Sequence, residues 1–169
     1  MPVTPPSPRT APLVLGIETS CDDTACAVLD GEGRVLSSVV SSQLEVHRPF
    51  GGVVPEAASR EHLRNWPAVS ESALRRAGCE IRDLGAVAAT YGPGLVGSLL
   101  VGLSIGKALA YARGLPFLAV HHLEGHLWSP FLRTGGAPAE APPARFVGLV
   151  VSGGHTTLGS VSGDSSTRA

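Results

Sequence analysis

The chain is organised around residues 120–130, V-H-H-L-E-G-H-L-W-S-P. If residues 123–131 form a helix, His122 and His126 lie four positions apart on one face, with their Cβ atoms ~5–6 Å apart. Two imidazoles at this spacing grip one metal ion in many zinc and iron sites. The same spacing also occurs on ordinary surface helices, so the pair by itself leaves both interpretations open.

The residues next to the pair favour a ligand site and restrict its type. The apolar run at 115–120 leads into the histidines, which predicts that they follow a buried strand, where α/β proteins place ligands. His121 is one position from His122, so its side chain points elsewhere and is expected to pack beside the site or to support it. Glu124 gives the order H-x-E-x-H, which is not the H-E-x-x-H arrangement of metalloproteases.

The preceding segment predicts a strand, a turn and a helix. Residues 84–90 are expected to form the strand, 91–94 (Y-G-P-G) the turn and 95–113 the helix. A helix N-terminus after such a turn can hold an anion, although glycine turns are also common packing devices. Gly102-x-x-x-Gly106 is a spacing of membrane helices, but Lys107 and other polar residues interrupt the run, so we expect a fully buried helix of a soluble domain.

The N-terminal part predicts a three-stranded meander followed by a helix. Residues 13–18, 25–29 and 35–41 are the expected strands. The turn at 19–24, T-S-C-D-D-T, suits a loop that faces a phosphate or a metal, and equally an ordinary Asx-rich turn. The helix starts at Pro55, and Gly78 ends it. Pro67 should kink it or split it in two. Its core-facing positions follow helical spacing: Ala58, His62, Trp66, Val69, Ala73 and Ala77.

The C-terminal part predicts two strands, at 146–151 and 156–161, joined by a glycine turn at 152–155. Gly153 and Gly154 permit close approach of a nucleotide to the main chain, and a plain hairpin turn explains them equally well. The whole order of elements predicts an α/β domain with a mixed sheet and helices packed against it. Three loops that follow strands then converge on one ligand, with these candidate nucleotide or phosphate residues: Ser20, Asp22, Asp23, Gly92, Gly94 and Gly154.

Composition excludes several classes of protein. With 169 residues, 43% hydrophobic and 16% charged, the chain is long and apolar enough for one domain with a core. The net charge of -1 excludes a broad basic surface for nucleic acid, although a local patch of arginines between residues 60 and 82 remains open. The three cysteines, Cys21, Cys26 and Cys79, have no metal spacing and indicate reduced thiols in a cytoplasmic protein.

Three segments are expected to be disordered or exposed. They are the proline-rich tail at 1–12, the loop at 134–143 and the small polar ending at 164–169. The folded domain is therefore expected to span residues 13–163.

Five motifs occur in one order along the chain. They are L-G-I-E-T-S-C-D at 15–22, G-G-V-V-P-E at 51–56 with A-S-R at 58–60, G-P-G-L-V-G-S-L-L-V-G at 92–102, H-H-L-E-G-H-L at 121–127 and L-V-V-S-G-G-H-T at 149–156. Together they resemble the tRNA adenosine threonylcarbamoyltransferases, formerly labelled O-sialoglycoprotein endopeptidases. The resemblance implies an actin-like, sugar-kinase-like and heat-shock-ATPase-like fold of two lobes, of which this chain covers the N-terminal lobe and the start of the second.

The resemblance also implies a function. Family members transfer a threonylcarbamoyl group from threonylcarbamoyl-AMP to the exocyclic amine of the adenosine beside the anticodon, in tRNAs that read codons beginning with A. They work in the cytoplasm, away from membranes, with partner proteins of the threonylcarbamoyl modification complex that include a paralogue pairing through its N-terminal lobe.

The site residues carry over by the same resemblance. His122 and His126 match two metal ligands for one divalent ion, iron or zinc, and the substrate-binding stretch matches Leu149, Val150, Val151, Ser152 and Gly153. The third ligand, an aspartate of the second lobe, is absent from this chain, so we expect weak metal binding and no transferase activity from the chain alone. Asp23 stands where the family commonly has glutamate, and no side chain is assigned as a general base.

Two other functions compete with this one. A metal-dependent glycoprotein endopeptidase would match the former label, but the absent H-E-x-x-H order argues against it. A non-catalytic partner or scaffold lobe would be expected to lack the histidine pair, which this chain retains.

Overall fold

The computed structural model describes residues 12–134, 143–151 and 156–162. Its central feature is a five-stranded mixed sheet with the order β3-β2-β1-β4-β5. The antiparallel part joins β1 to β2 and β2 to β3, and the parallel part joins β1 to β4 and β4 to β5. The strands are β1 (Leu13–Glu18), β2 (Asp23–Leu29), β3 (Val35–Ser42), β4 (Leu84–Gly92) and β5 (Phe117–His121). The predicted α/β class with a mixed sheet is confirmed.

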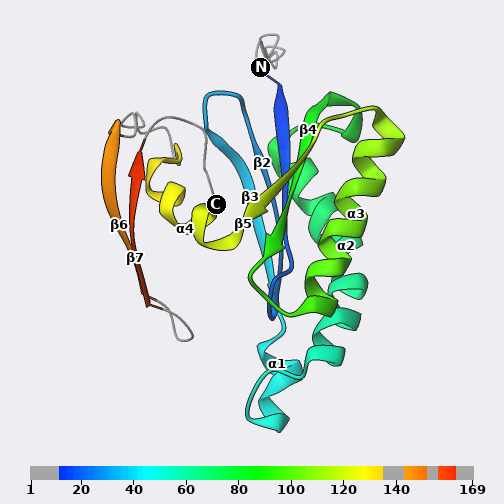
Figure 1. Cartoon of the computed structure of the whole chain (residues 1–169). Coiled ribbons are helices and arrows are strands. Elements are labelled where there is room, and N and C mark those ends of the chain that lie inside the picture. Colours follow the sequence, from blue (N-terminus) through cyan, green and yellow to red (C-terminus); the bar gives the residue numbers. More distant parts are fainter. Residues whose placement is uncertain (1–11, 135–142, 152–155, 163–169) are drawn as a thin grey trace, which may run out of the picture.

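The helices form layers on both faces of this sheet (Figure 1). The long helices α2 (Pro55–Ala77) and α3 (Val96–Arg113) cover one face, and the short α4 (His122–Trp128) lies on the other. An antiparallel hairpin of β6 (Arg145–Val151) and β7 (Thr156–Ser162) stands beyond α4. The remaining elements are α1 (Leu44–His47) and three single-turn 3₁₀ helices, Arg48–Phe50, Ile81–Asp83 and Ser129–Phe131.

The core lies between the sheet and the two long helices. Alternate residues of β1, Leu13, Leu15 and Ile17, point into it, as the period of a strand requires. The predicted stripe of α2 faces them: Ala58, His62, Val69, Ala73 and Ala77 are buried, and Trp66 packs at its edge. Gly78 ends α2 in the left-handed conformation, with φ 62°, and its N–H bonds the Arg75 carbonyl.

Of the two outcomes predicted for Pro67, a kink or a split, the split does not occur, because α2 continues through this residue over 23 residues. A proline removes the hydrogen bond to the carbonyl four residues earlier, here that of Leu63. Both Leu63 and Pro67 lie on the exposed side of the helix. Water can therefore bond to the freed carbonyl, and the helix continues.

Helix α3 is not fully buried, which corrects a second prediction. Only a stripe of small or apolar residues faces the sheet: Ser98, Leu99, Gly102, Gly106 and Ala110. A Cβ at Gly102 or Gly106 would collide with Thr19 or Phe117, so the glycine pair serves close packing of helix on sheet. The outer side carries exposed Val96, Leu100 and Tyr111, because α3 has no further layer over it. Within the described residues, no helix is long and apolar enough to cross a membrane.

Strand β5 is likewise not the buried strand that was expected before the histidines. It forms the edge of the sheet, and its Leu118 is half exposed. The tail at 1–11, residues 135–142 of the predicted loop, the glycine turn at 152–155 and the predicted disordered end at 164–169 lie outside the described residues.

Candidate metal centre

The two histidines of the organising stretch face each other on α4. The helix begins at His122, directly after β5, one residue earlier than predicted, and the chain continues from Trp128 into a 3₁₀ turn that ends at Phe131. The Nε2 atoms of His122 and His126 are 3.1 Å apart, and the rings stand at 85° with centroids 4.6 Å apart. Two unprotonated imidazole nitrogens would repel at this distance, so a proton or a cation belongs between them.

The separation fits a shared ion. With nitrogen–metal bonds of ~2.0–2.1 Å, two nitrogens at this distance subtend roughly 100° at the ion, which lies between octahedral and tetrahedral geometry. Within residues 12–134, 143–151 and 156–162, no cluster of three or more histidine, cysteine or carboxylate side chains is arranged to hold a metal. Among the described residues, His122 and His126 therefore offer an ion two imidazole nitrogens and no third ligand of these types.

Glu18 holds His122 from the side away from this pair. It is the last residue of β1, and its Oε2 lies 3.1 Å from His122 Nδ1. The same oxygen accepts a hydrogen bond of 2.6 Å from Thr90 Oγ1, and Oε1 accepts one from the Ser20 amide. A carboxylate that accepts from Nδ1–H fixes the imidazole tautomer and leaves the Nε2 lone pair for an ion.

Glu18 is ionised at neutral pH. Burial raises the pKa of its carboxyl group, but the hydrogen bonds from Ser20, Thr90 and His122 outweigh that effect and hold the pKa below its ordinary value. A negative charge therefore lies behind His122. It raises the basicity of the ring as a ligand.

Two of the three predicted loops meet at this point. The Ser20 carbonyl accepts a hydrogen bond of 2.8 Å from Leu95 N, and Ser20 Oγ lies 3.4 Å from His122 Nδ1. A Cβ at Gly94 would collide with the backbone of Ser20, which explains this glycine by packing alone. Apart from its chain neighbours, no described residue lies within 4 Å of the Cβ position at Gly92.

The other predicted residues of these loops divide into two groups. The Asp22 and Asp23 carboxylates make no hydrogen bond or ion pair with either histidine in the described part of the chain. Ser152, Gly153 and Gly154 lie outside the described residues. His121 packs edge-on against Tyr91, with ring centroids 5.7 Å apart, as expected for a residue beside the site.

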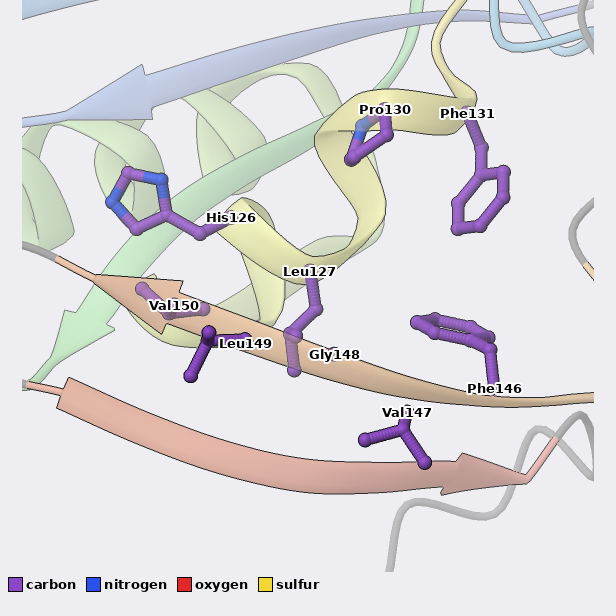
Figure 2. A pocket seen from close by; sticks show the side chains of 9 residues that line it. All are labelled: His126, Leu127, Pro130, Phe131, Phe146, Val147, Gly148, Leu149 and Val150. Carbon is purple, nitrogen blue, oxygen red and sulfur yellow. The ribbon is translucent and has the colours of Figure 1, made fainter.

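An apolar hollow of about 330 Å³ opens next to His126, between α4 and β6 (Figure 2). Phe131 and Phe146 form one end of it, with ring centroids 5.2 Å apart. Leu149 and Val150, two residues of the predicted substrate-binding stretch, line it, whereas Val151 does not. Gly148 lets β6 lie close to α4, because a Cβ at this position would collide with the side chain of Leu127.

Sequence reasoning missed Glu18 and Thr90. Glu18 is the last residue of β1, and Thr90 lies two residues before the end of β4, which runs parallel and adjacent to β1 in a register that pairs Ile17 with Ala89. The available signal was the polar residue at the end of each apolar run, since carboxyl ends of neighbouring parallel strands meet at one sheet edge.

Comparison with known proteins identifies similar sequences and folds. The family model described as tRNA N6-adenosine threonylcarbamoyltransferase matches residues 34–168. A protein of that name from Pelobacter propionicus is 58% identical over 151 residues, which cover 89% of this chain and 43% of that protein. One from Caldicellulosiruptor saccharolyticus is 56% identical, covering 86% and 42%. The chain thus spans less than half the length of these curated relatives.

Two solved structures from Pseudomonas aeruginosa share the fold. YeaZ has a TM-score of 0.52 at 20% identity and covers 88% of this chain and 64% of its own. A protein described as uncharacterized with similarity to peptidase YEAZ has a TM-score of 0.55 at 21% identity and covers 88% and 63%. At these identities the likeness concerns the fold alone, and it confirms the expected architecture.

Proposed function

Because this chain belongs to the tRNA N6-adenosine threonylcarbamoyltransferase family, we propose that it forms the histidine-bearing lobe of an enzyme that transfers a threonylcarbamoyl group from threonylcarbamoyl-AMP to tRNA. The acceptor is the exocyclic amine of the adenosine beside the anticodon, in tRNAs that read codons beginning with A. The observation that carries the proposal is the pair of Nε2 atoms 3.1 Å apart, with Glu18 fixing the orientation of His122.

In this proposal His122 and His126 hold one divalent ion, iron or zinc. The ion would supply a positive charge that orients and polarises the acyl donor, with open positions because two imidazoles do not fill its coordination shell. The missing protein ligand, expected to be an aspartate, belongs to the part of the relatives that this chain does not match, more than half of their length.

The chain's own groups do three things for the reaction. Glu18 keeps the His122 ring in the tautomer whose Nε2 faces outward. Ser20 and Gly94 pack two loops together next to that ring, and Gly92, whose Cβ position is open, pairs with His121 in the sheet. The hollow beside His126 offers an apolar wall for the donor, with Leu149 and Val150 in it.

The bonds exchanged are those of acyl transfer. The adenosine amine forms a bond to the carbamoyl carbonyl carbon, the bond from that carbon to the phosphate oxygen breaks, AMP leaves and the amine loses one proton. No covalent bond to the protein is needed, because positioning and charge stabilisation suffice for such a step. We assign no side chain as the base.

We also propose a cytoplasmic setting with tRNA and the other proteins of the threonylcarbamoyl modification complex as partners. Cys21 and Cys26 form no disulfide in the structure, which supports a reducing compartment.

The test joins this chain to the C-terminal remainder of the Pelobacter propionicus relative and measures transfer of threonine-derived radiolabel to tRNA. We expect the chimera to modify tRNA and to carry one metal ion, and the 169-residue chain to be inactive. His122→Ala and His126→Ala should each lower transfer at least about 100-fold, because a ligand is lost outright. Undiminished transfer by both variants would refute the proposal.

A further inference from the structure

A buried polar network lies beneath the loop at 20–24, away from the histidine pair. Its three side chains come from two different parts of the chain: Gln43 and His47 from the end of β3 and α1, and His62 from the middle of α2. All three are almost completely inaccessible to solvent, and His62 is 0% exposed. Buried polar groups are costly unless each is paired, so the partners of this network define its role.

The partners determine the tautomer of His62. Its Nε2 is 3.1 Å from the carbonyl oxygen of Cys21, which can only accept, so Nε2 carries the proton. Its Nδ1 must then accept, and it receives hydrogen bonds from Thr24 Oγ1 at 2.8 Å and from Gln43 Nε2 at 3.1 Å. Burial lowers the pKa of His62, with opposing contributions from Cys21 and nearby carboxylates, which agrees with a neutral ring.

The rest of the network is equally determined. With Gln43 Nε2 donating to His62 and to the Ala58 carbonyl at 3.4 Å, its Oε1 is left to accept from His47 Nε2 at 3.1 Å. His47 Nδ1 accepts from the Val54 amide at 3.3 Å. Each polar atom of the three side chains thus acts either as a donor or as an acceptor. No other choice of histidine tautomers and glutamine orientation gives all of these atoms a hydrogen bond.

The network holds the loop at three points. His62 binds the Cys21 carbonyl and the Thr24 hydroxyl, and the backbone N–H of Gln43 donates to the Asp22 carbonyl at 3.0 Å. The residue just before these three, Ser20, is the one that contacts His122 and bonds Glu18 through its amide. Fixing the loop from below therefore fixes Ser20 and, through it, the groups that orient His122.

We propose that His62 is a positioning residue: through the Cys21 carbonyl it holds the loop at 20–24 in the conformation that keeps Glu18 and Ser20 against His122. The effect on metal binding rests on the proposed function above, whereas the effect on the loop does not. If His62 only filled the core, its substitution would affect the loop and metal binding no more than another core substitution does.

Two substitutions separate the two bonds of the His62 ring. In His62→Gln the amide nitrogen reaches the place of Nε2 and can still donate to the Cys21 carbonyl. In His62→Asn the amide lies at the place of Nδ1 and is too short to reach it. Val69→Ala is the matched control, because Val69 is buried on the same helix, in the hydrophobic core, and its loss weakens the core without touching the loop.

The first readout is the labelling rate of Cys21 in the 169-residue chain by a disulfide reagent at pH 8, with a small free thiol in the same solution as the reference. Cys21 is exposed, but partial burial of the sulfur and the charges of Asp22 and Asp23 raise its thiol pKa to about 11, so the wild-type rate is low. A released loop exposes the sulfur to water and breaks its hydrogen bond with the Asp22 side chain, and both changes lower the thiol pKa. We expect His62→Asn to raise the rate at least about tenfold, and His62→Gln, which keeps the bond to the Cys21 carbonyl but loses the one to Thr24, to raise it by clearly less.

The second readout is the affinity for cobalt(II), followed through its visible spectrum. We expect His62→Asn to weaken binding about tenfold, the usual effect of one supporting hydrogen bond, and to shift the spectrum. Val69→Ala should match the wild type, and His62→Gln, which keeps the bond to Cys21 but loses the Nδ1 acceptor for Thr24, should change the affinity by less than His62→Asn. Should His62→Asn fail to fold, Thr24→Val removes one hydrogen bond of the same loop at equal volume, and should move both readouts in the same direction by less.

The inference is overturned if His62→Asn leaves both the Cys21 rate and the cobalt affinity unchanged. It is also overturned if His62→Gln or Val69→Ala changes them as much. If the Cys21 rate responds as expected but the wild-type chain binds no cobalt, the loop role of His62 stands and the proposed metal function fails.

Discussion

The site is best tested at Glu18. The substitution Glu18→Gln removes the negative charge and replaces one acceptor oxygen by a donor NH₂ group, while the side chain keeps its shape. In the structure Oε1 accepts from the Ser20 amide, and Oε2 accepts from both Thr90 Oγ1 and His122 Nδ1. A glutamine side chain has one oxygen and one NH₂ group. Wherever the NH₂ group is placed, it faces a group that was donating to the carboxylate.

Each placement has a defined consequence. With NH₂ at the Oε1 position, the Ser20 amide faces another donor, and the loop in front of His122 is pushed away. With NH₂ at the Oε2 position, His122 Nδ1 has to become the acceptor, which moves the ring proton to Nε2 and removes the lone pair that an ion needs. Loss of such a supporting carboxylate lowers metal affinity about 10- to 100-fold, which corresponds to ~1.4–2.8 kcal/mol.

The assay is titration of the 169-residue chain with zinc or cobalt(II) by calorimetry, with Glu124→Gln as the matched control. Glu124 lies on α4 between the two histidines in the sequence, so the control removes the same charge from the helix that carries them, and within the described residues it bonds to neither ring. We expect Glu124→Gln to bind within about threefold of the wild type, as a surface charge permits. Equal metal affinity in Glu18→Gln and the wild type would refute the reasoning.

Three further predictions concern the fold. Gly94→Ala should destabilise the chain by about 1–3 kcal/mol in urea unfolding, because its Cβ collides with the Ser20 backbone; a neutral result would mean that the two loops are not in contact. Pro67→Ala should raise the free energy of unfolding by up to ~3 kcal/mol, since it restores the hydrogen bond to Leu63 in a helix that is already continuous, and a lower melting temperature would contradict this. The third prediction is a pH effect of His62: its pKa is lower folded than unfolded, so its contribution is complete above pH ~6.5 and is lost as pH falls below that, with a slope of at most ~1.4 kcal/mol per pH unit. Urea unfolding of wild type and His62→Gln between pH 7.5 and 5.5 measures it, and identical slopes would count against a neutral buried ring.

The sequence was sufficient to predict the elements whose residues repeat with the period of a strand or of a helix. The meander, the stripe of α2 and the helix that carries His122 and His126 follow from spacing, capping residues and turn residues, and all are present. The convergence of the loops at 19–24 and 92–94 also followed, because both were placed after strands of one sheet.

Long-range register accounts for what the sequence did not predict. Glu18 becomes the support of His122 only because β1 pairs in parallel with β4 and brings Thr90 beside it, a pairing of residues 72 positions apart. His62 fell on the predicted core stripe, but its partners come from the loop at 20–24 and from Gln43, which periodicity does not reveal.

The prediction that α3 is fully buried was wrong for a related reason. Apolar composition shows that one face of a helix is covered, and it does not say how many layers the fold has. In this chain α3 lies on the outside of a single helix layer, so Val96, Leu100 and Tyr111 are exposed although most of the helix is uncharged.

The central claim is that the facing nitrogens of His122 and His126 hold one ion between them. X-ray absorption spectroscopy of the zinc-loaded chain tests it most directly, with His126→Gln as the comparison. We predict one zinc per chain with two imidazole nitrogens at ~2.0–2.1 Å in the wild type, and one or none in the variant. Zinc that shows no imidazole scattering, or the same scattering in the wild type and in His126→Gln, would contradict it.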